Sequence, residues 1–176
     1  MDDLRDLIRT IPDFPKPGIL FRDVTTLIGH KTGFHKAISA LVARYKASRI
    51  DAVAGIEARG FILGSAIAYG LGVGFIPLRK KGKLPGEAMG EDYALEYGTD
   101  RIEMHVGAVS HGERVLLVDD LIATGGTAGA AIKLLESAGA VIVETCFLVD
   151  LPDLKGAEKI RKLGHNVFAL VDFEGH

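Results

Sequence analysis

The chain has 176 residues, a length typical of one compact domain, and 48% of them are hydrophobic, which can supply a sizeable core. Its formal net charge of −2 gives no basic footprint for a nucleic-acid partner, and no apolar stretch approaches the ~20 residues that cross a membrane. Met1–Arg9 lacks the apolar run of a secretory signal and Cys146 is the one cysteine, so we expect a cytoplasmic protein without an internal disulfide.

The predicted elements begin with a short helix, because apolar residues from Leu4 to Ile11 recur at helical spacing. Three prolines at positions 12–17 then enforce an extended segment, and a second apolar face predicts a helix over Phe34–Tyr45. The later predicted strands are Ala52–Ile56, Val73–Leu78, Val115–Val118, Val141–Leu151 and Asn166–Val171. The later predicted helices are Phe61–Tyr69, Thr127–Ala138 and Gly156–Leu163.

Short strands that are apolar on both faces alternate with helices, which predicts an α/β fold with a parallel central sheet and helices on both faces. Arg79–Val106 interrupts this rhythm, because it is polar and rich in glycine and charge. We expect this stretch to combine a long loop with a short hairpin. No linker or internal repeat divides the chain, so a single domain over residues 1–176 is expected.

Val115–Thr127 carries the clearest chemical pattern. Its apolar strand ends in Asp119 and Asp120, at the edge where α/β sheets bind ligands. Thr124–Thr127 then opens a helix, whose N-terminus, glycine N–H groups and threonine hydroxyls suit a phosphate. Carboxylates repel phosphate but accept hydrogen bonds from sugar hydroxyls, so the two acids predict a ribose diol. The whole pattern predicts a site for a phosphorylated ribose.

The alternative interpretation of this segment is a strand-to-helix turn with solvated acids. The acid pair, both threonines and the apolar strand together favour the ligand site. A Walker A loop is excluded because Gly-Lys-Ser/Thr is absent, and the Gly-x-Gly-x-x-Gly dinucleotide fingerprint is absent as well.

Val115–Thr127 resembles the signature of the type I phosphoribosyltransferases. Five further segments, in the same order and over nearly the whole chain, resemble the adenine phosphoribosyltransferases within that family: Phe14–Gly18, Phe21–Asp23, Glu57–Phe61, Arg79–Gly86 and Leu95–Gly98. The resemblance implies the type I phosphoribosyltransferase fold, with a small hood formed by the N-terminal segment and a mobile loop over about residues 79–98. It implies a purine salvage enzyme that transfers the 5-phosphoribosyl group of 5-phosphoribosyl-1-pyrophosphate to N9 of adenine, giving AMP and pyrophosphate. A homodimer is implied too, with no nucleic-acid or membrane partner expected.

The resemblance also implies roles for single residues. Glu96 would be the general acid–base group near adenine N7, and Tyr97 would belong to the loop that closes over the donor. The other implied contacts are Asp119, Asp120, Ala123, Thr124, Gly125, Gly126 and Thr127 for the donor and AMP, Arg59, Arg79 and Lys83 for pyrophosphate, and Leu20, Phe21 and Arg22 for adenine. Mg²⁺ would arrive on the donor's oxygens without a direct protein ligand. A non-proline cis peptide would fall at Glu57–Ala58.

Ala123 bears on the choice of base. Family members that use 6-oxopurines typically place an aspartate at this position, so Ala123 favours adenine over hypoxanthine and guanine. A transferase for a pyrimidine is a second possibility, against which Ala123 and the Phe21-Arg22 segment weigh. A third is a non-catalytic ligand sensor, a class that normally adds a nucleic-acid-binding segment.

Overall fold

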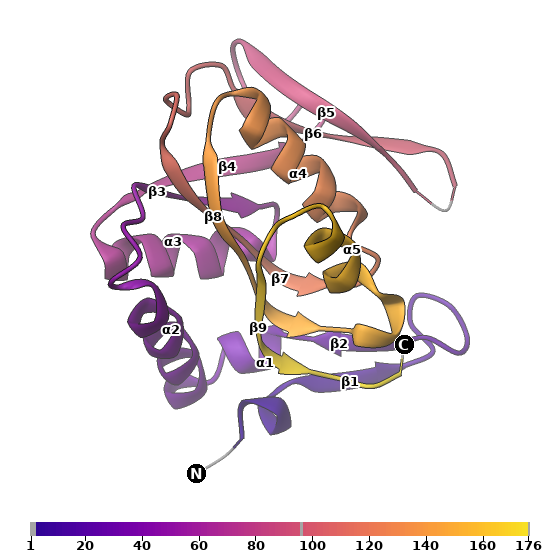
Figure 1. Cartoon of the computed structure of the whole chain (residues 1–176). Coiled ribbons are helices and arrows are strands. Elements are labelled where there is room, and N and C mark those ends of the chain that lie inside the picture. The colour runs from indigo at the N-terminus through magenta and orange to yellow at the C-terminus, as the bar shows by residue number, and fades with distance from the viewer. Residues whose placement is uncertain (1–2, 96, 176) are drawn as a thin grey trace.

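A computed structural model describes residues 3–95 and 97–175 of the protein. A seven-stranded sheet runs through it in the order β5-β6-β4-β3-β7-β8-β9 (Figure 1). The mutually parallel strands are β4 (Gly74–Lys80), β3 (Ala52–Ile56), β7 (Arg114–Ile122), β8 (Val141–Asp150) and β9 (Val167–Asp172). The antiparallel strands β5 (Ala88–Ala94) and β6 (Thr99–His105) extend the β4 edge. The predicted α/β fold with a parallel central sheet is confirmed.

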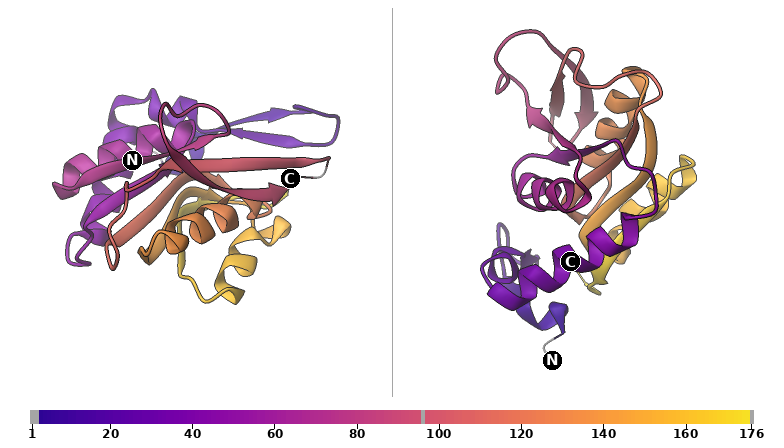
Figure 2. Two further views of the ribbon diagram at one scale, coloured as in Figure 1. Left: turned by 90° about the horizontal axis from the view of Figure 1, so that it is seen from above. Right: turned by 90° about the vertical axis from the view of Figure 1, so that its left-hand side faces the viewer.

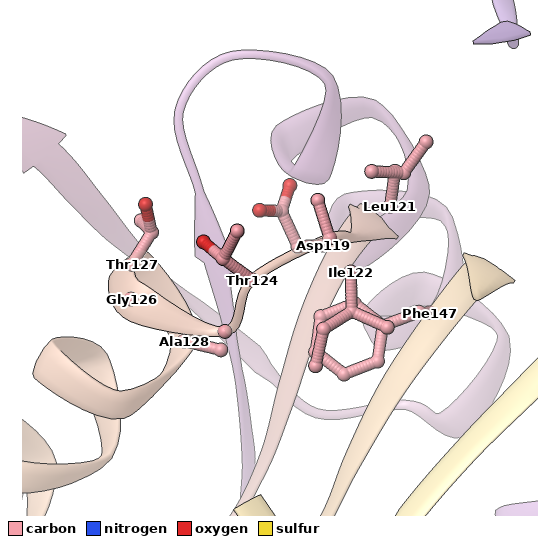
Figure 3. Close-up of a pocket in the computed structure, with 10 residues that line it drawn as sticks. Asp119, Leu121, Ile122, Thr124, Gly126, Thr127, Ala128 and Phe147 are labelled. Carbon is pink, nitrogen blue, oxygen red and sulfur yellow. The ribbon is translucent and has the colours of Figure 1, made fainter. Parts of the chain in front are cut away.

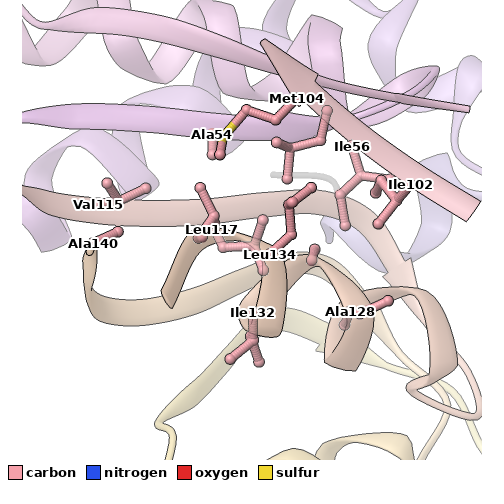
Figure 4. Packing of buried hydrophobic residues seen from close by; sticks show 14 of the residues in the cluster. Ala54, Ile56, Ile102, Met104, Val115, Leu117, Ala128, Ile132, Leu134 and Ala140 are labelled. Atoms are coloured by element: carbon pink, nitrogen blue, oxygen red, sulfur yellow. The ribbon is translucent and has the colours of Figure 1, made fainter. Parts of the chain in front are cut away.

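Helices cover both faces of this sheet (Figure 2). They are α1 (Thr25–Ile28), α2 (Lys31–Tyr45), α3 (Arg59–Leu71), α4 (Gly126–Ser137) and α5 (Gly156–Lys162), with 3₁₀ turns η1 (Leu4–Leu7) and η2 (Pro152–Leu154). Ala54 and Leu117 belong to the core under α4 and α5 (Figure 4), whereas Val53 and Leu116 belong to the core under α2 and α3. Successive strand residues point to opposite faces, so one apolar run supplies both cores. None of the helices in the described residues is long and apolar enough to span a membrane.

The N-terminal segment forms a separate two-stranded hairpin of β1 (Arg9–Pro12) and β2 (Leu20–Asp23). The predicted opening helix is therefore wrong beyond Leu7, because Ile11 lies in β1 and pairs with Phe21. The spacing of apolar residues fits a helix, but the β-branched Thr10 and Ile11 and the following Pro12 suit a short strand that has a pairing partner. We call β1, β2 and their connecting loop the hood.

Residues 79–106 are more regular than the predicted loop with a short hairpin. β5 and β6 pair over seven residues each. Ile102 and Met104 alternate with polar neighbours and are fully buried, which is the period-2 pattern of a half-buried strand. The Lys80 ammonium donates to the Tyr93 hydroxyl at 2.6 Å and to an Asp100 carboxylate oxygen at 2.5 Å, which ties this hairpin to β4.

Candidate active site

The β7–α4 connection forms a small cavity at the carboxyl end of the sheet (Figure 3). Gly125 caps α4 with a left-handed backbone, φ 79°, which a residue with a side chain rarely adopts. A Cβ on Gly125 would also lie 3.0 Å from the carbonyl oxygen of Gly156, and the N–H of Gly156 donates to the Ala123 carbonyl at 3.0 Å. The residues that line the cavity are Asp119, Leu121, Ile122, Ala123, Thr124, Gly125, Gly126, Thr127, Ala128 and Phe147. We call this loop and cavity the cradle.

The polar side chains of the cradle face one space. Figure 3 shows the Asp119 carboxylate and the Thr124 and Thr127 hydroxyls on the same side of the loop. Free N–H groups and the positive end of the α4 dipole meet at this point, because the first turn of a helix has no internal partners for its N–H groups. The cradle therefore combines anion-binding groups with one carboxylate that can accept hydrogen bonds from hydroxyls.

Asp119 and Asp120 have different surroundings, although they are neighbours. The N–H of Asp120 donates to Asp119 Oδ1 at 2.8 Å. Burial and the nearby charge of Asp120 raise the pKa of Asp119 well above the usual range. Asp120 is 5% exposed and forms an ion pair with the Arg59 guanidinium. Burial lowers the pKa of Arg59, but the charge of Asp120 outweighs this and the pKa is raised. Asp119 thus faces the cradle, whereas the charge of Asp120 is balanced by Arg59.

A second, mainly apolar cavity of about 360 Å³ lies between the hood and the cradle. It is lined by Ile19, Leu20, Phe21, Arg22, Arg59, Leu121, Ala123, Thr124, Leu151 and Leu154. Leu121, Ala123 and Thr124 also line the cradle, so the two cavities share a wall. All three residues expected to contact adenine meet here. Leu151 and Leu154, which had no local signal in the sequence, complete the lining of this cavity, which we call the base pocket because adenine is expected here.

The β3–α3 turn holds a basic segment through Glu57. The peptide bond Glu57–Ala58 is cis, as the resemblance implied. Glu57 Oε2 accepts from Arg79 Nε at 3.2 Å and from the N–H of Lys80 at 2.9 Å, and Arg79 Nη1 donates to the carbonyl of Lys83 at 3.3 Å. Burial raises the pKa of Glu57, but these donors outweigh it and the pKa is lowered. Arg79 and Lys83 therefore lie together, anchored by a residue whose role the sequence did not reveal.

The β5–β6 hairpin approaches both the hood and the cradle. Tyr97 is 78% exposed, and its ring lies 5.3 Å from the Lys16 ammonium in the hood. A Cβ on Gly126 would lie 3.8 Å from the carbonyl oxygen of Ala94, which brings the end of β5 next to the cradle. Glu96, expected to act as the acid–base group, lies outside the described residues. Within 3–95 and 97–175, no three His, Cys, Asp or Glu side chains gather where they could hold a metal ion.

Comparisons with known proteins agree with this architecture. The phosphoribosyl transferase domain family matches residues 28–174. The adenine phosphoribosyltransferase of Bradyrhizobium sp. strain BTAi1 is 61% identical over 174 residues, which cover 99% of this chain and 97% of that protein. The crystal structure of adenine phosphoribosyltransferase from Thermoanaerobacter pseudethanolicus has a TM-score of 0.92 at 45% sequence identity, and the match covers 97% of this chain and 98% of that chain. The crystal structure of the Saccharomyces cerevisiae enzyme has a TM-score of 0.88 at 42% sequence identity, and the match covers 95% of this chain and 96% of that chain. That enzyme is complexed with D-2,5-dideoxy-2,5-imino-altritol 1,6-bisphosphate and adenine. The chain belongs to the phosphoribosyl transferase domain family and, within it, to the adenine phosphoribosyltransferases.

Proposed function

We propose that this protein transfers the 5-phosphoribosyl group from 5-phosphoribosyl-1-pyrophosphate to N9 of adenine, giving AMP and pyrophosphate for purine salvage. The observation that carries the proposal is the wall that the cradle and the base pocket share, Leu121, Ala123 and Thr124. In AMP a ribose joins a phosphate to a purine, so adjoining sites for an anion and a flat apolar ring fit that product. The yeast relative, complexed with adenine and a bisphosphate, supports the same pairing of sites.

In this proposal the cradle holds the phosphorylated ribose. The backbone N–H groups and hydroxyls of Thr124–Thr127 bind the 5-phosphate, and Ala123 leaves room beside it. Asp119 and Asp120 accept hydrogen bonds from the ribose diol, and the presence of Asp119 in the lining of the cradle supports this role. The ion pair between Asp120 and Arg59 neutralises one of the two acids, which lowers their repulsion toward the donor's phosphates.

Pyrophosphate leaves, in our proposal, against Arg59, Arg79 and Lys83. The guanidinium groups of Arg59 and Arg79, which also pair with Asp120 and Glu57, offer donors to the oxygens of the departing group, and Lys83 adds positive charge. Mg²⁺ prefers oxygen ligands and keeps several waters, so we propose that it enters on the donor's own oxygens. When bound, it supplies further positive charge at the leaving group.

Adenine binds between the hood and the cradle, against Leu20, Phe21 and Arg22. The apolar walls of the pocket suit a purine ring, and the aromatic ring of Phe21 supplies a stacking surface. Glu96 then holds or moves the proton at adenine N7, and Tyr97 closes over the donor with the β5–β6 tip. The contact between Tyr97 and Lys16 supports a tip that reaches the hood. A homodimer and a cytoplasmic location stay predictions.

The test is turnover of 5-phosphoribosyl-1-pyrophosphate and Mg²⁺ with adenine, hypoxanthine, guanine, orotate and uracil in separate reactions. We expect AMP from adenine and little product from the other bases, because Ala123 provides no acid for a 6-oxopurine. Turnover of hypoxanthine or guanine without turnover of adenine would overturn the assignment of the base. Binding of AMP without turnover of any base would favour the ligand-sensor alternative instead.

A further inference from the structure

The segment that follows β9 crosses from the core to the hood (Figure 1). We call Phe173–Gly175 the strap. The N–H of Phe173 donates to the Asp150 carbonyl at 3.0 Å, which anchors the strap on β8. Two arginines lie near the Phe173 ring, with the guanidinium carbon of Arg22 at 4.5 Å from the ring centroid and that of Arg5 at 5.8 Å. The Nη2 of Arg22 also donates to the carbonyl of Glu174 at 3.0 Å.

The end of the strap reaches the opposite wall of the base pocket. The N–H of Gly175 donates to Asp153 Oδ2 at 2.7 Å. Asp153 lies in η2 and directly precedes Leu154, which lines the pocket. A Cβ on Gly175 would lie 3.7 Å from Leu20 Cδ1, so the strap also packs beside the hood wall. The strap therefore contacts both walls between which the base would lie.

Arg22 transmits this contact to β2. Its Nη1 donates to Thr10 Oγ1 at 2.6 Å, so the guanidinium joins β1, β2 and the strap. Leu20 lies two residues before Arg22 on the same strand, and such residues share one face. A two-stranded hairpin is marginally stable by itself in water. The hood consequently depends on contacts such as these to hold Leu20 and Phe21 in place.

We propose that the strap, through the stacking of Arg22 on Phe173, positions β2 and thereby sets the affinity for adenine. The inference rests on the proposed function. Phe173 is a positioning residue, because it is half-buried among core residues and is not among the residues that line the base pocket or the cradle. The donor's cradle is built by β7 and α4, so the strap affects the base and leaves the donor's binding unchanged.

The test compares Phe173→Leu with Phe173→Tyr. Leucine keeps apolar bulk but removes the ring face, so we expect KM for adenine to rise about two- to fivefold, the size of an exposed cation–π contact. KM for the donor and kcat should change less than about twofold, since the cradle is untouched. Tyrosine keeps the ring and should restore the wild-type KM for adenine. Amide hydrogen exchange in the hood should become faster in Phe173→Leu only.

Phe168→Leu is the matched control. Phe168 lies on β9, and the guanidinium carbon of Arg44 lies 3.8 Å from its ring centroid, so the same kind of contact is lost away from the pocket. It should lower the melting temperature without changing KM for adenine or hood exchange. An unchanged KM in Phe173→Leu, or an equal rise in Phe168→Leu, would overturn the proposal. If the wild type fails to use adenine, the proposed function is wrong. The positioning role has its own test: it is wrong if amide hydrogen exchange in the hood of Phe173→Leu is as slow as in the wild type.

Discussion

Gly60 allows α3 to begin directly against the end of β7, and replacing it with alanine should disturb Asp119. A Cβ at Gly60 would lie 2.9 Å from Asp119 Oδ1, 3.0 Å from the Val118 carbonyl oxygen and 3.2 Å from Asp119 Cα. Two of these three atoms belong to the backbone of a central strand. Rotation of a side chain cannot relieve such contacts, so either α3 or the end of β7 has to move.

The expected magnitude follows from two opposing terms. Overpacking of a well-packed site costs about 1–3 kcal/mol. Replacing a helical glycine by alanine increases stability by roughly 0.5–1 kcal/mol, because alanine loses less backbone entropy on folding. The net loss in unfolding free energy is therefore about 0–2.5 kcal/mol, or up to ~10 °C in melting temperature for a chain of this size. Because the displaced carboxylate faces the cradle, kcat/KM for the donor should fall by about 10²-fold, the cost of a misplacement on the order of 1 Å.

Gly129→Ala is the control for this variant. In α4 the nearest atom to a Cβ at Gly129 is Ile160 Cδ1 at 3.8 Å, an ordinary van der Waals distance. Thermal unfolding should show a gain of roughly 0.5–1 kcal/mol, because the helix accepts alanine without displacement. Donor kinetics should match the wild type. If Gly60→Ala keeps both the melting temperature and the donor kcat/KM of the wild type, the close approach does not constrain Asp119 and the reasoning fails.

Three further predictions concern ionisable groups. Burial and the charge of Asp120 raise the pKa of Asp119 in the folded protein. Ionisation of Asp119 therefore opposes folding once the pH exceeds the pKa of the unfolded chain, about 3.9. Each tenfold change in the acid dissociation constant corresponds to about 1.4 kcal/mol of stability. Asp119→Asn should therefore raise the melting temperature at pH 7, and thermal unfolding at several pH values should show that this gain vanishes below about pH 4. Titration with the donor should show weaker binding. Glu57→Ala should weaken inhibition by pyrophosphate about tenfold, because Arg79 loses its charged acceptor, whereas Glu57→Gln keeps an acceptor oxygen and should retain most of the inhibition. Glu96→Leu should lower kcat by ~10²–10⁴ and leave donor binding intact in direct titration, and near-normal turnover would remove Glu96 from the acid–base role.

The cradle could be predicted from the sequence because its parts are adjacent along the chain. The apolar strand, the acids, the glycine that caps α4 and the helix all fall within about a dozen consecutive residues, and each local preference agrees with the others. The base pocket is different, since its walls come from the hood, β7, η2 and the start of α3. Leu154 has no local feature that distinguishes it from a core leucine, so only the folded chain identifies it as a pocket residue.

The hood shows where local patterns stop being sufficient. Apolar spacing from Leu4 to Ile11 fits a helix, but the pairing of Ile11 with Phe21 is a tertiary interaction that outweighs this preference. Residues 79–106 are typical of a loop with a short hairpin because of their glycines and charges, whereas the alternation that ends in Ile102 and Met104 carries the strand signal. The charged side chains on the exposed face of the hairpin masked that alternation.

Arg22 illustrates the consequence for function. The sequence places it beside the base by resemblance, yet its guanidinium binds Thr10, 12 positions away, and Glu174, 152 positions away. Glu57, by contrast, reaches Arg79 over 22 positions that β3 and β4 bring together as neighbours in the sheet. Donor contacts thus depend on the rigid central sheet, and base contacts depend on a marginal hairpin held by distant segments. Substitutions remote from the site should accordingly alter adenine affinity more readily than donor affinity, because a two-stranded hairpin relies on contacts with distant segments for its stability.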